Sequence, residues 1–178
     1  QPLSESNWFN LAQVFRFQNK IELAENAYQK ALDIHPKFTR ARIALANLYV
    51  VQKNHIEAKK HFEQTLAQDH HNIQALNDYG CMLLDQQDYS KAQKIFEQLL
   101  QSAPHNANGY FNLGLALMKQ GVKNIAETAY RKAIEYDPHF ARPYFHLANL
   151  LHDKGELEQA QHFYEKLVQI QPSFIGGM

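Results

Sequence analysis

The residue types that most often do chemistry in proteins are present in this chain, but their spacing assembles no catalytic or metal site. Ten histidines are scattered along the sequence, and none has a second histidine at the His-x3-His spacing that would place two metal ligands on one helix face. His70 and His71 are adjacent at an expected turn, where we expect their side chains to point apart into solvent. The sequence therefore predicts no metal site and no cofactor.

A nucleophile with its supporting base is not evident either. Cys81 is the single cysteine, so it forms no internal disulfide, and without a cation or a helix start beside it we expect a small packing residue. His152 and Asp153 are adjacent on an expected helix, but no third group completes a catalytic set. Gly80 and Gly114 are expected within helices, so neither belongs to a phosphate-binding loop. We predict that the chain is not an enzyme.

The charge and hydropathy of the chain narrow the classes of partner. Lys plus Arg and Asp plus Glu number 18 each, so the formal net charge is +0 and no overall field attracts nucleic acid or an anionic membrane. No apolar run approaches the roughly 20 residues needed to cross a bilayer. The hydrophobic content of 45% is typical of a folded, soluble protein. We expect such a protein in the cytoplasm or the periplasm, and the compartment stays open.

A fixed sequence period organises the chain, and successive members of each repeated column differ in number by 34 (58 − 24 for the first two alanines). An alanine recurs in phase five times without insertion or deletion, a large aromatic follows each alanine by four residues, and a proline closes four of the five units. The alanines are Ala24, Ala58, Ala92, Ala126 and Ala160, the aromatics are Tyr28, Phe62, Phe96, Tyr130 and Tyr164, and the prolines are Pro36, Pro104, Pro138 and Pro172.

These columns resemble the tetratricopeptide repeat, whose pattern is aromatic-x2-Leu-Gly-x2-Tyr, then Ala-x3-Phe, then Pro within one repeat. The first unit matches through Trp8, Leu11, Ala12, Phe15, Ala24, Tyr28, Ala31 and Pro36, and the fourth through Tyr110, Leu113, Gly114, Leu117, Ala126, Tyr130, Ala133 and Pro138. The resemblance implies an all-α fold, a right-handed α-α superhelix or solenoid of five helix-turn-helix units and ten helices. We expect one domain over 5–174, with repeats 5–38, 39–72, 73–106, 107–140 and 141–174, and a C-terminal tail at 175–178.

The resemblance also implies a function, because in the family the first helix of each repeat lines a concave groove. We therefore expect a protein–protein interaction scaffold or adaptor that holds a peptide or protein segment, binds no nucleic acid and does not insert into a membrane. Apolar anchors, amides and isolated cations at the groove positions suit an extended or helical peptide. The expected groove residues are Phe9, Gln13, Arg16, Arg40, Ile43, Asn47, Asn77, Cys81, Asn108, Phe111, Asn112, Leu115, Lys119, Arg142, Phe145, His146, Asn149 and His152.

Some members of the family hold a C-terminal carboxylate with a clamp of two cations and two asparagines, and that clamp is absent here. Asn112 and Arg142 keep the second asparagine and one cation. Asn77 and Cys81 stand where the first lysine and the first asparagine are needed. We therefore expect no receptor for chaperone tails, although Arg142 with His146 and Asn112 could hold an acidic side chain.

Two narrower functions remain open. The segment Asn77-Asp78-Tyr79-Gly80 loosely resembles an asparagine-tyrosine-glycine motif of pilus-assembly lipoproteins, so a pilus or secretion assembly factor is one alternative. The other is the substrate-selecting arm of a larger enzyme such as a glycosyltransferase, in which asparagines line the inner face of the superhelix. The asparagines that could form such a ladder are Asn10, Asn47, Asn112 and Asn149.

The last helix pair is expected to leave an apolar edge, because a repeat array needs a polar element at its end. This edge carries Tyr164, Leu167 and Val168, and only the residues up to Met178 follow. An apolar strip of this size rarely stays in water. We expect either that the natural protein continues past Met178 or that the chain self-associates through this edge, unless Phe174 folds back as a cap.

Overall fold

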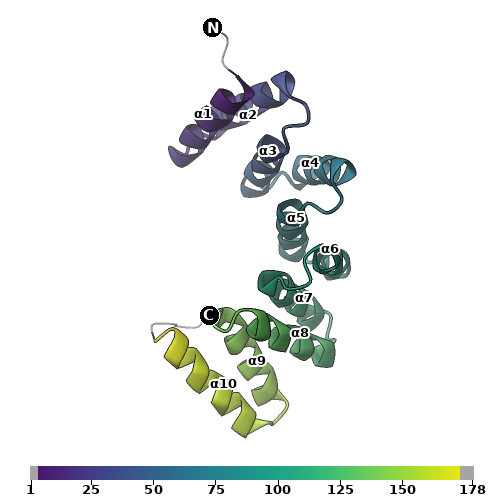
Figure 1. The fold of residues 1–178 in the computed structure, drawn as a ribbon, viewed down its shortest axis with the longest axis vertical. Helices are drawn as coiled ribbons and strands as arrows, with labels where there is room; N and C mark the ends of the chain where they lie inside the picture. The colour runs from purple at the N-terminus through teal and green to yellow at the C-terminus, as the bar shows by residue number, and fades with distance from the viewer. Residues whose placement is uncertain (1–3, 173–178) are drawn as a thin grey trace. The chain divides into compact units, whose positions relative to one another are not determined.

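The computed structural model describes residues 4–172, which form ten α-helices and no β-strand (Figure 1). This confirms the predicted all-α fold class. The expected end of the fifth repeat at residue 174, the fold-back of Phe174 and the tail at 175–178 lie outside the described residues. The helices are α1 (Glu5–Phe17), α2 (Ile21–Ile34), α3 (Thr39–Val51), α4 (His55–Gln68), α5 (Ile73–Asp85), α6 (Tyr89–Ser102), α7 (Ala107–Lys119), α8 (Lys123–Tyr136), α9 (Ala141–Asp153) and α10 (Leu157–Ile170).

The helices follow the period of the sequence. Each odd-numbered helix has 13 residues and begins exactly one sequence period after the previous one, and each even-numbered helix has 14 residues with the same offset. In Figure 1, α1 lies alongside α2 and α3 alongside α4, so consecutive helices pack as pairs. An unbroken period puts each repeated residue in the same place in its pair, and for this reason all five alanines of the alanine column are buried.

The turn inside each pair places one residue in the left-handed region of backbone conformation. The positive φ angles are 58° at Asn19, 61° at Lys53 and Gln87, and 79° at Gly121 and Gly155, and these positions are again one period apart. Glycine adopts this conformation freely, whereas a residue with a β-carbon is strained by roughly 1–2 kcal/mol. In the second and third repeats the turn residues are Lys53 and Gln87, which do not favour this conformation by themselves. There the packing of the helix pair imposes the geometry of the turn.

Side-chain caps mark the start of several helices. The hydroxyl of Ser4 accepts a 3.3 Å hydrogen bond from the amide of Asn7, and Oδ1 of Asn106 accepts one of 2.7 Å from the amide of Gly109. Asp88 caps α6 in the same way. Each cap satisfies an amide that has no partner inside the helix, which is worth about 1 kcal/mol.

The chain divides into two compact units, one that ends at Met82 and one that begins at Leu83. We call them unit 1 and unit 2 and describe each by itself; the expected single domain over 5–174 stays a prediction. The core of unit 1 gathers apolar side chains of α1 to α3 around Tyr28, and a main core of unit 2 gathers those of α7 to α10 around Tyr130. Both tyrosine side chains are fully buried.

Candidate binding site

A cavity of about 480 Å³ lies on unit 1 between α1, α3 and the first turn of α5. We call it the unit-1 groove. Its wall mixes guanidinium, amide and apolar side chains, and contains no Asp or Glu. The lining residues are Phe9, Gln13, Arg16, Asn19, Ile21, Arg40, Ala44, Asn47, Leu48, Val51 and Gln74.

Two arginines bring positive charge to the unit-1 groove. The guanidinium carbon of Arg40 lies 5.1 Å from the centroid of the Phe9 ring, which is a cation–π contact. Nε of Arg16 donates a 3.2 Å hydrogen bond to Oε1 of Gln13. Both arginines are exposed, and neither forms an ion pair with a carboxylate within residues 4–172. The described protein therefore supplies no counter-charge in direct contact with them.

One carboxylate, that of Asp78, lies beside the groove and is held by amides. Nδ2 of Asn47 donates a 2.7 Å hydrogen bond to Oδ2 of Asp78 from the neighbouring odd-numbered helix. Nδ2 of Asn77 donates a 3.1 Å bond to the other carboxylate oxygen. The first bond ties α3 to α5 and fixes the orientation of the Asn47 side chain in the groove wall, whereas the second lies within α5.

Part of the predicted groove set meets in the unit-1 groove. Ile43 is not part of it, because its side chain is buried and does not line the cavity, so we remove it from the site. Asn77 and Cys81 are half-buried on α5 and do not line the cavity. Phe9 contributes only a small exposed part of its ring, since 7% of the residue is accessible. The predicted residues that line the groove are Phe9, Gln13, Arg16, Arg40 and Asn47.

Phe111 is a core residue of unit 2 and not an exposed anchor. Its side chain is 1% exposed. The ring centroid lies 5.2 Å from that of Phe140 and 6.0 Å from that of Tyr130, and the ring of His146 is 5.3 Å away. Neighbouring rings thus occupy the surface that a ligand would need, and the predicted ligand contact of Phe111 is corrected. Asn112 is also buried, with 8% exposure.

Positive charge gathers above this buried ring. The guanidinium carbon of Arg142 lies 4.6 Å from the centroid of the Phe111 ring. Burial lowers the pKa of His146 below its ordinary value of 6.5, and the positive charges of Arg142 and Lys119 lower it further. Arg142 and Lys119 are exposed and form no ion pair in the described part of the chain. We call Lys119, Arg142 and His146 the unit-2 basic cluster.

The other predicted residues of unit 2 are spread over its surface. Oδ1 of Asn149 accepts a hydrogen bond from the hydroxyl of Tyr164. His152 is exposed, with Nδ1 3.7 Å from Oδ1 of Asp153. The structure does not bring these residues together in a cavity with the basic cluster. Asn108 is exposed, and Leu115 and Phe145 are half-buried.

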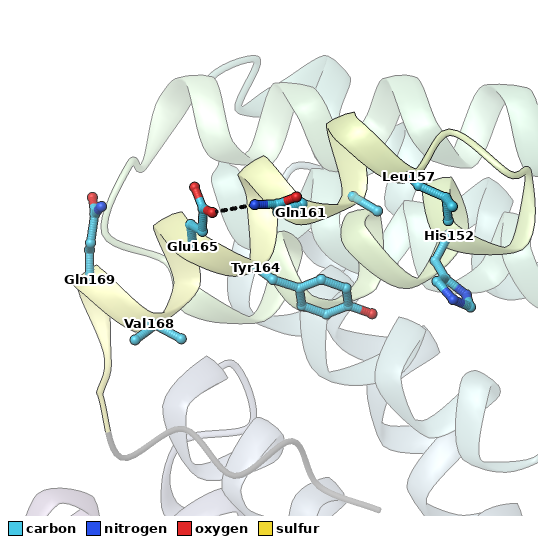
Figure 2. A pocket seen from close by; sticks show the side chains of 8 residues that line it. His152, Leu157, Gln161, Tyr164, Glu165, Val168 and Gln169 are labelled. Carbon is cyan, nitrogen blue, oxygen red and sulfur yellow. Dashed lines mark hydrogen bonds between the residues drawn. The ribbon is translucent and has the colours of Figure 1, made fainter.

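A cavity of about 610 Å³ lies along the outer side of α10 (Figure 2). We call this surface the α10 face. Tyr164 and Val168 project from one side of the helix in Figure 2, and Leu157 and Val168 are 60% and 61% exposed. The residue one period before Tyr164 is Tyr130, which is fully buried. The lining residues of the face are His152, Leu157, Ala160, Gln161, Tyr164, Glu165, Val168 and Gln169.

No group of three or more His, Cys, Asp or Glu side chains within residues 4–172 is placed to hold a metal ion. The prediction that His70 and His71 point apart is wrong, because their ring centroids are 4.0 Å apart where the turn brings the two side chains together. In the same part of the chain, no helix has the length and apolarity needed to cross a membrane.

The family model described as the cytochrome c-type biogenesis protein H TPR domain matches residues 1–104 of this chain. This is more than half of the 178 residues. Two further models, each described as a tetratricopeptide repeat, match residues 107–140 and 129–162. The chain belongs to the tetratricopeptide repeat family. The predicted resemblance is thereby confirmed.

Several solved structures share this tetratricopeptide repeat fold. MamA of Desulfovibrio magneticus RS-1 is 19% identical, with 97% of each chain covered and a TM-score of 0.83. PilF of Pseudomonas aeruginosa is 24% identical over 98% of this chain and 77% of its own, with a TM-score of 0.85. YrrB, described as a TPR protein with an unusual peptide-binding site, is 24% identical over 95% of this chain and 87% of its own, with a TM-score of 0.74. No curated protein sequence matches significantly.

The tetratricopeptide repeat positions alone did not indicate the whole groove wall. Asn19 and Ile21 line the cavity from the turn and from the start of α2, although both lie outside the first helix of a repeat. Leu48 is 2% exposed but still forms part of the wall. An asparagine at the expected turn is the sequence signal that could have indicated Asn19 and Ile21. Asparagine tolerates the left-handed conformation that Asn19 adopts, and this turn directs the chain past the end of α1.

Proposed function

We propose that this chain is a protein–protein interaction scaffold that holds a peptide or an extended protein segment in the unit-1 groove. The observation that carries the proposal is the cavity of about 480 Å³, in which two arginines that form no ion pair within residues 4–172 adjoin amides and an apolar floor. A volume of this size lies in the range of ligand sites, which is about 300–1,000 Å³.

The chemistry of the groove wall suits a polypeptide. Gln13 and Gln74 carry amides that can donate to and accept from a peptide backbone. Val51, which is 71% exposed, offers apolar surface for a ligand side chain. Arg40 is held over Phe9, so its guanidinium is oriented before a ligand arrives and less rotamer entropy is lost on binding.

We propose further that the chain has no catalytic activity of its own. The titratable groups near the groove are two arginines and the amide-bound Asp78, and they offer neither a nucleophile with a base nor a metal set. The fold is one that serves as a stack of helix pairs with an extended binding surface.

The family description names cytochrome c-type biogenesis, so a polypeptide of a c-type cytochrome is the first partner to test. The arm of a glycosyltransferase is not favoured. Its amide ladder would need asparagines that face a ligand, but Asn47 is bonded to Asp78 and Asn149 to Tyr164. The likeness to PilF is one of fold, and we propose no pilus role from it.

Peptide display tests the proposal. The chain is panned against a random peptide library and against overlapping peptides of a c-type cytochrome, and binders are titrated by fluorescence anisotropy. Arg40→Ala should weaken a groove binder about tenfold or more. Lys59→Ala is the matched control, because Lys59 is an exposed cation on α4, away from the groove, with Nζ 3.6 Å from Glu63. Equal loss in both variants, or no binder from either library, would contradict the proposal.

A further inference from the structure

We propose that the chain carries two equivalent carboxylate-binding sites, one in each unit, and that its partner is an acidic polypeptide segment. Each site is centred on an arginine held over a phenylalanine ring: Arg40 over Phe9 in unit 1 and Arg142 over Phe111 in unit 2. The proposal rests on the scaffold function above and names the chemistry of the segment that the scaffold binds.

The two sites are copies of one arrangement. Phe111 follows Phe9 by 102 residues (111 − 9), and Arg142 follows Arg40 by the same number (142 − 40), which is three sequence periods. The distances from guanidinium carbon to ring centroid are 5.1 Å and 4.6 Å. The same offset also relates Phe38 to Phe140, whose ring centroids lie 5.4 Å and 5.2 Å from those of Phe9 and Phe111.

The surroundings of each phenylalanine are duplicated as well. Tyr28 lies 5.9 Å from Phe9 between ring centroids, and Tyr130 lies 6.0 Å from Phe111. Both tyrosines are fully buried, so each phenylalanine is fixed from below. Each arginine thus rests on a ring that cannot move aside.

The helix-pair fold does not require this arrangement. The equivalent position pairs in the second and third repeats are Ile43 with Gln74 and Asn77 with Asn108, which have neither the ring nor the cation. These repeats nevertheless form the same helices as the others. The phenylalanine–arginine pair is therefore an addition to the repeat, made once in each unit.

Charge at both sites indicates an anionic ligand. The unit-1 groove contains Arg16 and Arg40 and no carboxylate in its wall. In unit 2, the exposed Arg142 lies over the Phe111 ring, and the positive charges of Arg142 and Lys119 both act on His146. The formal net charge of the whole chain is +0, so this is local charge and not a general basic surface.

The geometry favours carboxylates. A guanidinium is planar and carries its N–H groups in that plane, where two of them can form parallel bonds to a carboxylate. A polypeptide with Asp or Glu side chains fits such isolated sites. Nucleic acid would instead need a basic stripe that follows its backbone.

Side-chain NMR of the full chain tests the proposal directly. The Nε–Hε signals of Arg40 and Arg142 are assigned from the variants Arg40→Lys and Arg142→Lys, and a blocked triglutamate peptide is titrated in. Both signals should shift with similar midpoints, and each Lys variant should lose the response of its own site only. Arg131 is the internal control, because its Nε already donates a 2.9 Å bond to Glu127 and its signal should stay in place. Circular dichroism checks that the variants keep the helical fold.

Three outcomes would overturn the inference. Arg131 could shift as strongly as Arg40 and Arg142, a blocked triglutamine peptide could act like triglutamate, or a single-stranded oligonucleotide could shift the signals at lower concentration than the peptide. The scaffold function can fail separately. A display peptide that is weakened by Arg40→Ala and not by Lys59→Ala, together with no response of either arginine to triglutamate, would keep the scaffold function and remove the carboxylate sites. A positive triglutamate titration with no display binder would keep the carboxylate sites and remove the scaffold function.

Discussion

The backbone of Gly114 lies so close to the ring of Tyr130 that a β-carbon on Gly114 would come within 2.5 Å of Cε1. This contact joins α7 to α8 at the place where the repeat pattern has its small residue. Tyr130 has no room to withdraw, because it is fully buried against Phe111.

Gly114→Ala should therefore destabilise the chain even though alanine favours a helix over glycine by about 1 kcal/mol. We expect a net loss of about 1–3 kcal/mol from overpacking, measured by urea denaturation. Gly121→Ala is the comparison, because nothing lies within 4 Å of its added carbon and only the positive φ of 79° is strained. A Gly114→Ala protein as stable as wild type would show that the helices can move apart.

Phe111→Ala should unfold unit 2 readily, because the ring is 1% exposed and packs in the core. Loss of a buried phenylalanine costs about 3–5 kcal/mol. The sequence analysis placed Phe111 among the expected groove residues, where truncation would spare stability, but its burial leads to the opposite expectation. Phe145→Ala, at a half-buried position, should cost clearly less. Thermal melts of the two variants decide the matter, and equal losses would contradict the assignment.

Stability should decrease in mild acid through His146. Its pKa is lowered in the folded chain, first by burial and then by Arg142 and Lys119, so the unfolded chain binds the proton more readily. The contribution is present above the ordinary pKa of 6.5 and is lost as pH falls below it towards the folded pKa. His146→Gln should reduce the difference in melting temperature between about pH 7.5 and about pH 5.5. His61 has a lowered pKa too and remains in both proteins, so the comparison isolates His146.

Self-association through the α10 face stays a prediction, with a second copy of the chain as the occupant. Leu157 and Val168 are apolar and mostly exposed there, and such strips seldom remain in water. Light scattering should show mass increasing with concentration, and Leu157→Glu with Val168→Glu should return the chain to monomer. Leu167→Glu is unsuitable, because Leu167 is 5% exposed and packs with Tyr144. A wild-type chain that stays monomeric would contradict the prediction.

The sequence by itself determined the helices and their register. A fixed period can be read from the order of the residues alone, and each helix pair needs only its own apolar stripe and turn to form. The alanine column was accordingly predicted at positions that are all buried. Even the αL turn at Gly121 follows from the residue type.

The tertiary structure alone decided which groove positions are open. Phe9 and Phe111 occupy a repeat position that lines the groove in the family. A phenylalanine at the end of the same repeat packs against each ring, Phe38 against Phe9 and Phe140 against Phe111. Burial depends on this second partner, which no single helix pattern contains. For the same reason Arg40 and Arg142 could be named from the sequence as groove residues, whereas their position over the Phe9 and Phe111 rings was seen only in the tertiary structure.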